Sequence, residues 1–221
     1  MDLFPLRLSL QVAAISTGIT LVIGTFLGLL FARREFTGKN LLDVLISLPI
    51  VFPPTVTGYY LIVLLGREGW FGGPIYRLTG WSLSFTWGAA VLASIIVSLP
   101  LMVKTSRSAI ESVDPLYERV SYSLGRSKWA TFFKIILPLS KKGILAGVVL
   151  SFARAMGEFG ATLMFAGNIP GKTNTLPLAI YSAFAAGDTR MAGVLVILHS
   201  LICVGLLYMI QLLVGNKKVF L

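Results

Sequence analysis

Two residues of opposite charge, Arg154 and Glu158, lie four positions apart inside an apolar run at 143–166. A charge at the centre of a bilayer costs about 2.5–3.5 kcal/mol on insertion scales. On one helix the two side chains share a face, so that each neutralises the other and lowers this cost. We expect that face to point at other helices or at water. Two roles remain open: a structural pair that fixes helix packing beside Gly160, or a pair that lines a translocation pathway.

Two further patterns could suggest chemistry. The stretch "AGNIPGKT", at 166–173, fits a relaxed phosphate-binding loop, but that loop needs a strand before it. Here an apolar helical run precedes it, so we interpret the stretch as a Gly/Pro turn. His199 and Cys203 lie four apart in the last apolar run, where no further metal ligands stand at useful spacing. We therefore expect no metal site, no cofactor and no catalytic cluster in this chain, and we do not expect it to be an enzyme.

The composition indicates an integral membrane protein. Of the 221 residues, 56% are hydrophobic and only 13% are charged, whereas soluble domains carry about 25% charged residues. Several apolar runs exceed the roughly 18 residues that suggest a spanning helix. The sequence predicts a single all-α transmembrane domain over residues 1–221, multi-pass in the cell membrane, with about five spans at 8–32, 41–65, 84–103, 143–166 and 191–214.

The distribution of positive charge predicts the orientation. The formal net charge is +10, and cytoplasmic segments of membrane proteins are enriched in Lys and Arg. Most of the basic residues follow the first, third and fifth spans, which places the N-terminus outside and the C-terminus in the cytoplasm. The positive charge is then explained by topology, and we expect no nucleic-acid partner. The basic residues in question are Arg33, Arg34, Lys39, Lys104, Arg107, Arg119, Arg126, Lys128, Lys134, Lys141, Lys142, Lys217 and Lys218.

The second span carries helix-breaking residues near its middle. Pro53, Pro54 and Gly58 crowd a short stretch, and each proline removes a backbone donor and clashes with the preceding turn. Lipid cannot satisfy the freed carbonyl groups, so protein or water must do so. Two interpretations stay open: a kinked helix packed on its neighbours, or a broken helix that lines a pathway.

The basic segment between the third and fourth spans, at 104–142, is the most informative. Asp114, followed by a proline, is typical of a helix start, and Gly125 fits a helix end. Ser127 can cap a second short helix, which we expect Pro138 to end. Two short amphipathic helices around a glycine turn can lie on the lipid surface or dock into a groove of a cytoplasmic partner.

The spacing within this loop resembles a family signature. Glu118 is followed seven residues later by Gly125, and then by Ile-Ile-Leu-Pro ending at Pro138. Permeases of ABC importers carry Glu-Ala-Ala, a glycine and Ile-x-Leu-Pro at these distances; here Arg119 and Val120 replace the two alanines. The stretches "SVDPLYERVSYSLG" and "FARAMGEFGATLMFAGNIPGKTNTLPLAIY" are similar to molybdate permeases. Sulfate and tungstate permeases are the close alternatives.

The resemblance implies a function and a set of partners. The chain would be the membrane-spanning subunit of an ATP-driven importer that passes molybdate, or a similar tetrahedral oxyanion, into the cytoplasm by alternating access. Its partners would be a second copy of itself, two cytoplasmic ATPase subunits that bind ATP and Mg, an extracytoplasmic oxyanion-binding protein and the lipid bilayer. An autonomous channel or secondary carrier would be the alternative of another class, but we find no convincing inverted repeats among the five spans.

The resemblance also assigns residues. Coupling to the ATPase would fall to Glu118, Arg119, Ser121, Leu124, Gly125 and Pro138. The candidates for the pathway, or for packing beside it, are Pro53, Pro54, Gly58, Arg154, Glu158 and Gly160.

Overall fold

The computed structural model describes residues 2–214, and over that range the chain is helical with no strand. Four helical segments are long and apolar enough to cross a membrane: α1 (Phe4–Arg33), α5 (Trp87–Glu111), the segment Lys128–Met156 that ends in α8, and α11 (Thr189–Val214). A bent pair, α2 and α3, makes a fifth if it is counted as one span. The predicted all-α membrane protein with about five spans is confirmed at this level. Lys217 and Lys218 lie outside the described residues.

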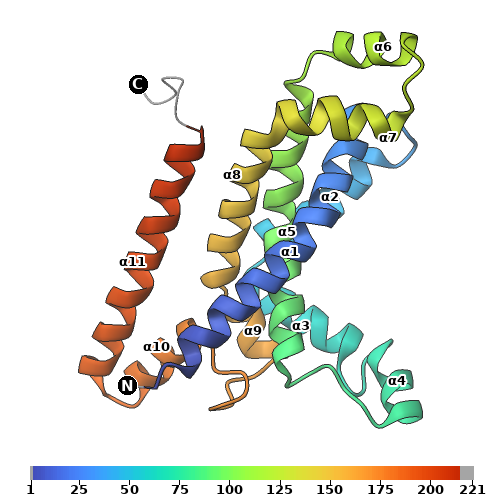
Figure 1. Cartoon of the computed structure of the whole chain (residues 1–221). Helices are drawn as coiled ribbons and strands as arrows, with labels where there is room; N and C mark the ends of the chain where they lie inside the picture. Colours follow the sequence, from blue (N-terminus) through green and yellow to red (C-terminus); the bar gives the residue numbers. More distant parts are fainter. Residues whose placement is uncertain (1, 215–221) are drawn as a thin grey trace.

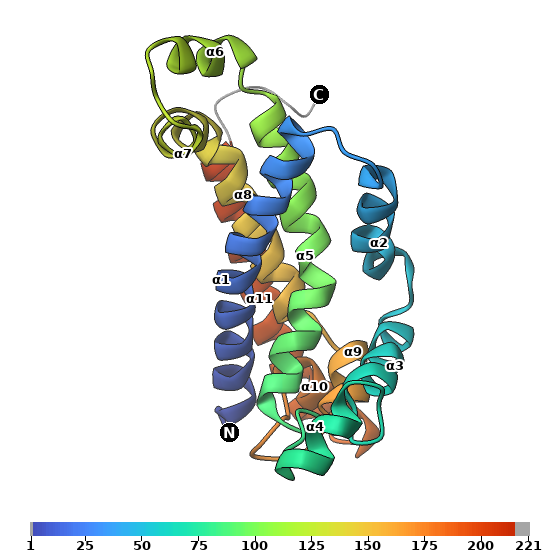
Figure 2. The ribbon, with the colours of Figure 1, turned by 90° about the vertical axis from the view of Figure 1, so that its right-hand side faces the viewer.

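Three helices, α1, α5 and α8, pack side by side and form the centre of the bundle (Figures 1 and 2). Small side chains fill the contacts between them, which lets the helix backbones approach closely where lipid offers no hydrophobic drive. Several of their hydroxyl groups bond within their own helices, as Ser98 Oγ does in donating to Ser94 O over 2.6 Å. The fully buried small residues of α1 and α5 include Ala13, Ser16, Thr20, Ala90, Ala93, Ser94 and Ser98.

The second span is broken, not merely kinked. The chain bends by 118° between helix α2 (Lys39–Val51) and helix α3 (Pro54–Leu65). Between them Phe52 and Pro53 are extended, with ψ of 140° and 136°, because a residue that precedes proline avoids the helical region. Pro54 then occupies the first turn of α3, where no backbone donor is required.

The fourth span is also interrupted. Helix α8 (Leu137–Met156) stops at Gly157, and a short helix, α9 (Gly160–Phe165), follows it. The prediction of one uninterrupted helix over 143–166 is therefore wrong. Glu158 lies in the break, so it does not share a helix face with Arg154 as expected. The sequence Gly-Glu-Phe-Gly allows the break, because two glycines weaken the helix on either side of a residue that can cap the next one.

The predicted loop at 104–142 is shorter than expected, because α5 continues to Glu111. Helix α6 (Pro115–Ser123) and helix α7 (Lys128–Thr131) follow, and a π-helical turn at Phe132–Ile136 joins α7 to α8 without interruption. The prediction that Pro138 ends a separate helix is wrong. Leu137 N donates to Phe132 O, five residues back, and this wider turn accommodates the proline ring in the first turn of α8.

Aromatic residues lie at both ends of the bundle. At the end opposite α6 lie α4 (Gly72–Thr79) and α10 (Leu176–Ala185), as Figures 1 and 2 show. Trp70 and Trp81 are exposed beside α4, and Trp129 and Phe133 are exposed at the α6 end. Aromatic side chains favour the two membrane–water interfaces, so these residues mark the levels at which the bundle leaves the bilayer.

Candidate functional site

The first candidate region is the pair of short helices α6 and α7, which local interactions order. Asp114 Oδ1 accepts from Leu116 N over 2.8 Å at the start of α6. Ser127 Oγ accepts from Ala130 N over 3.2 Å at the start of α7. Gly125 has a φ of 77° between them, a conformation that glycine adopts without steric cost. The caps and the glycine turn lie where the sequence predicts them.

A buried hydroxyl pair holds the two short helices together. Ser121 Oγ and Thr131 Oγ1 lie 2.8 Å apart, and both residues are shielded from solvent. Because each hydroxyl is the other's partner, removing either one leaves a buried polar group without its bond. Ser121, a coupling candidate from the sequence, therefore holds α6 against the start of the α7 segment.

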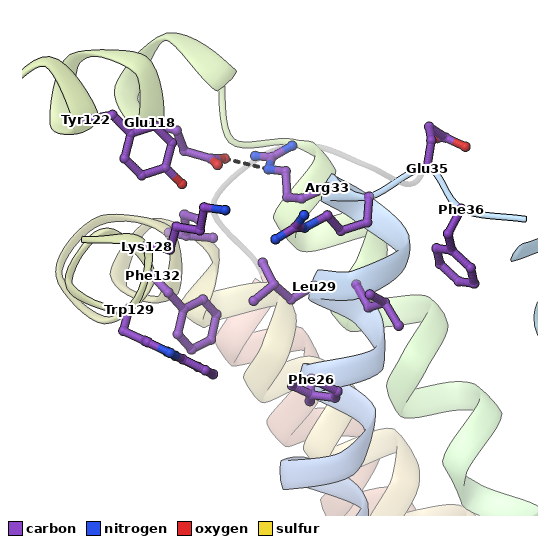
Figure 3. Close-up of a pocket in the computed structure, with 13 residues that line it drawn as sticks. Phe26, Leu29, Arg33, Glu35, Phe36, Glu118, Tyr122, Lys128, Trp129 and Phe132 are labelled. Carbon is purple, nitrogen blue, oxygen red and sulfur yellow. Dashed lines mark ion pairs between the residues drawn. The ribbon is translucent and has the colours of Figure 1, made fainter. Parts of the chain in front are cut away.

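Glu118 joins α6 to the end of α1. Its Oε1 lies 2.5 Å from Arg33 Nε, although the N–H is not aligned on the oxygen, so the contact is an ion pair rather than a linear hydrogen bond (Figure 3). Both side chains are largely shielded, at 13% and 17% exposure. Arg33 Nη2 also donates to the carbonyl oxygens of Ile110, over 2.9 Å, and of Val113, over 2.8 Å. One guanidinium thus ties α1, the end of α5 and α6 together.

Arg33 was not a candidate from the sequence, where it counted only toward the charge distribution. The cations nearest to Glu118 in the sequence are Arg119 and Arg126. The partner is instead 85 positions away, and no periodicity in the sequence could have indicated it.

The outer face of the two short helices remains uncovered by the described residues. It carries apolar side chains, of which Leu124 is 74% exposed, together with the exposed Arg119 and Gly125. An exposed apolar patch that is bordered by polar residues is typical of a docking surface. We call the set Leu116, Tyr117, Arg119, Val120, Leu124 and Gly125 the α6 face.

The second candidate region lies where the two broken spans meet. A Cβ on Gly58 of α3 would come within 2.7 Å of Met164 Cβ, and one on Gly160 of α9 within 2.8 Å of Pro54 Cβ. Either distance is too short for real atoms, so only glycine permits this contact. Pro53 stands just outside it, with its carbonyl accepting from Thr57 N over 3.2 Å. The structure thus brings Pro54, Gly58 and Gly160 into one close contact between α3 and α9.

Glu158 stabilises the break in the fourth span in two ways. Its Oε2 lies 2.7 Å from Arg154 Nη1 in the last turn of α8, and its Oε1 accepts from Ala161 N over 2.8 Å in the first turn of α9. The Glu158 side chain is 1% exposed, whereas that of Arg154 is 31% exposed. A carboxylate at a helix start also interacts favourably with the helix dipole. The predicted charge pair exists, but it joins two helices.

The remaining sequence candidates are the stretch at 166–173 and the pair His199 and Cys203. The stretch at 166–173 follows helix α9 and forms a turn, in which Thr173 Oγ1 donates to Gly167 O over 3.1 Å and accepts from Ile169 N over 3.0 Å. His199 and Cys203 lie on α11. Among the described residues no group of three His, Cys, Asp or Glu side chains could hold a metal ion.

Comparison with known proteins identifies the family. Residues 24–220 match the family described as binding-protein-dependent transport system inner membrane component. This chain belongs to that family. It is the permease subunit of an ABC importer, an inner-membrane protein that does not itself hydrolyse ATP and carries no cofactor, because nucleotide binds in a separate ATPase subunit. ATPase and binding-protein partners follow from the family.

Individual relatives differ in how closely they match the permease. It is 47% identical over 82% of its length to a molybdenum transport system permease protein of Haemophilus influenzae, of which it covers 80%. It is 36% identical over 85% of its length to a sulfate transport system permease protein of Synechococcus elongatus, of which it covers 65%. A solved structure of a bacterial ABC transporter involved in alginate import aligns with a TM-score of 0.74 at 13% identity, covering 98% of this chain and 80% of that one. That likeness concerns the fold alone.

Proposed function

We propose that the permease passes molybdate, or a similar tetrahedral oxyanion, from an external binding protein into the cytoplasm. The observation that carries the proposal is the 47% identity to a molybdenum permease over most of both chains. The sulfate relative is less similar, at 36%. Among the described residues few cations lie inside the spans, and one of them, Arg154, is paired with Glu158. In this proposal the binding protein therefore selects the ion, and the permease admits it.

Uptake into proteoliposomes tests the transported ion. The permease is reconstituted with its ATPase and binding protein, and molybdate uptake is measured against tungstate and sulfate as competitors. We expect tungstate and molybdate to compete with each other and sulfate to compete weakly. ATP-dependent sulfate uptake that molybdate does not inhibit would contradict the proposal.

We infer that the α6 end of the bundle faces the cytoplasm and that residues 1–221 form one transmembrane domain. Basic residues support this orientation, because they gather around α6, α7 and the nearby ends of α1 and α5, while few lie near α4 and α10. Single cysteines in a Cys203→Ser background provide the test. A cysteine at Lys142, which is exposed at the same end of the bundle but outside the α6 face, should react with an impermeant thiol reagent only after the cells are opened, and one at Leu78 should react in intact cells. The reverse pattern would exclude this orientation.

We also propose that the α6 face docks on the ATPase and that Glu118, through Arg33, passes its displacement to α1 and α5. The exposed apolar side chains and the contacts of Arg33 support this route. Leu124→Asp should abolish co-purification of the ATPase, because it places a charge in the docking surface. Ile75→Asp, at an exposed position of α4 on the opposite end, serves as the control. Equal ATPase recovery from both variants would refute the docking surface.

Two copies of the permease, we propose, pair to enclose the pathway. Helix α11 supports a partner, since only 6% of its most apolar window is buried within the described chain. The contact between α3 and α9 and the pair Arg154–Glu158 would then lie beside the pathway. Exchanging the two charged residues tests whether they act in transport: normal uptake by the exchanged protein would restrict them to a packing role. Cross-linking and mass measurement of the purified protein test the dimer.

A further inference from the structure

A cavity of about 480 Å³ lies between the end of α1 and the short helices α6 and α7 (Figure 3). On the side toward the middle of the bundle it is lined by apolar side chains, Phe26, Leu29 and Leu30 of α1 and Trp129 and Phe132 opposite them. It is open on that side, since Phe26 is 55% exposed and Trp129 62%. Its other side is charged. The cavity thus places apolar side chains beside charged ones, which is the arrangement of an amphiphile site rather than that of a site for a small ion.

The charges at the rim do not cancel. Arg33 pairs with Glu118, and Glu35 pairs with Lys39, whose Nζ lies 2.7 Å from its Oε1. Two other lining cations, Arg34 and Lys128, have no ion pair with any described residue. The lining residues thus carry a net charge of +1, which becomes +2 when Lys39, the partner of Glu35 just outside the cavity, is included.

The position of the cavity matches the level of lipid headgroups. Arg33 is the last residue of the spanning helix α1, and Lys128 begins the segment that runs into the span of α8. Trp129, at 62% exposure, belongs to the aromatic residues at this end of the bundle. In Figure 3, Lys128 points toward the end of α1, while Phe26 lies deeper along that helix. Basic pockets beside spanning helices bind anionic lipid headgroups.

We propose that this cavity binds an anionic phospholipid. Arg34 and Lys128 bind the headgroup phosphate, and an acyl chain lies along Phe26, Leu30 and Trp129. The lipid occupies the space between α1 and α7, beside the ion pair of Glu118 and Arg33. The bound lipid therefore stabilises the ion pair between Glu118 and Arg33 that holds α6 to the bundle. This assignment does not depend on which ion the permease transports.

Native mass spectrometry of the permease purified with its ATPase tests the site. Phosphatidylglycerol, or phosphatidylcholine of the same acyl chains, is added at equal concentration. We expect phosphatidylglycerol to stay bound and phosphatidylcholine to dissociate. Because each cation near a membrane surface contributes about five-fold in affinity, Arg34→Gln with Lys128→Gln should weaken phosphatidylglycerol binding by about 30-fold.

A matched control removes two other cations at the same end of the molecule. Lys141 and Lys142 are exposed at the start of α8 and do not line the cavity, so Lys141→Gln with Lys142→Gln changes the net charge equally and should leave binding intact. Leu30→Trp fills the cavity and should expel the lipid although every cation remains. Loss of phosphatidylglycerol from both Leu30→Trp and the variant Arg34→Gln with Lys128→Gln is expected only if the apolar wall and the charged rim both bind the lipid.

Three results would overturn the proposal. An equal loss of phosphatidylglycerol in the control variant would mean general surface attraction. Displacement by millimolar glycerol 1-phosphate would mean a site for soluble anions. Retention of phosphatidylglycerol by Leu30→Trp would mean that no acyl chain enters the cavity.

Discussion

The ion pair between Arg154 and Glu158 predicts that two charge-removing substitutions differ in cost. In Arg154→Gln the carboxylate of Glu158 remains, 1% exposed, after losing its cation. In Glu158→Gln the guanidinium of Arg154 remains, 31% exposed, and the new amide oxygen can still accept from Ala161 N as the carboxylate does. The stranded charge is thus buried in the first variant and partly hydrated in the second.

The expected difference follows from that exposure. Removing one partner of a buried ion pair costs about 3–5 kcal/mol, which we expect for Arg154→Gln. Glu158→Gln should cost about 1–2 kcal/mol, between the values for exposed and buried pairs. For a chain of this size the difference of about 2–3 kcal/mol corresponds to a Tm separation of about 4–12 °C. Glu158→Ala should lose about 1 kcal/mol more than Glu158→Gln, because α9 then loses its cap.

Thermal unfolding in detergent, followed by the fraction of protein that elutes as the folded species, measures these differences. The double variant Arg154→Gln with Glu158→Gln provides the control, because it leaves no stranded charge. It should be more stable than Arg154→Gln alone. Equal costs for the two single variants, the reverse order, or a double variant no better than Arg154→Gln would refute the reasoning.

Three further predictions concern close packing and the α6 region. Gly58→Leu should prevent folding or assembly, because the added side chain meets α9 at 2.7 Å, whereas Gly18→Leu, with open space around it, should express normally; equal yields would contradict the predicted clash. Gly125→Asp should leave the permease inserted, since nothing lies within 4 Å, but it strains the turn at a φ of 77° and should uncouple transport from ATP hydrolysis; wild-type uptake would count against this. Arg33→Gln should release α6 from the end of α1 and speed trypsin cleavage between α5 and α7 about ten-fold or more, because hydrogen bonds to charged groups contribute about 1.5–3 kcal/mol. An unchanged digestion rate would show that other contacts hold α6.

Local features of the chain were accessible from the sequence. Hydropathy indicated the spans, because each must cover the bilayer thickness with apolar residues whatever its neighbours are. Asp114, Gly125 and Ser127 indicated the caps and the turn of α6 and α7, because a cap is satisfied within three or four residues. The proline pair at 53–54 indicated a disturbed helix, although not whether it would bend or break.

The relation between segments was decided only by the tertiary structure. Arg33 meets Glu118 across 85 positions, and Gly58 meets α9 from another broken span, contacts that no local pattern encodes. Hydropathy also could not show that the fourth span stops at Gly157, since both helices around the break are apolar and the capping side chain of Glu158 looked like half of a helical pair. Arg154 and Glu158 first stood out as charges in a span. In the folded chain Glu158 instead lies between α8 and α9 and bonds to both, because a buried carboxylate needs both a cation and a backbone donor.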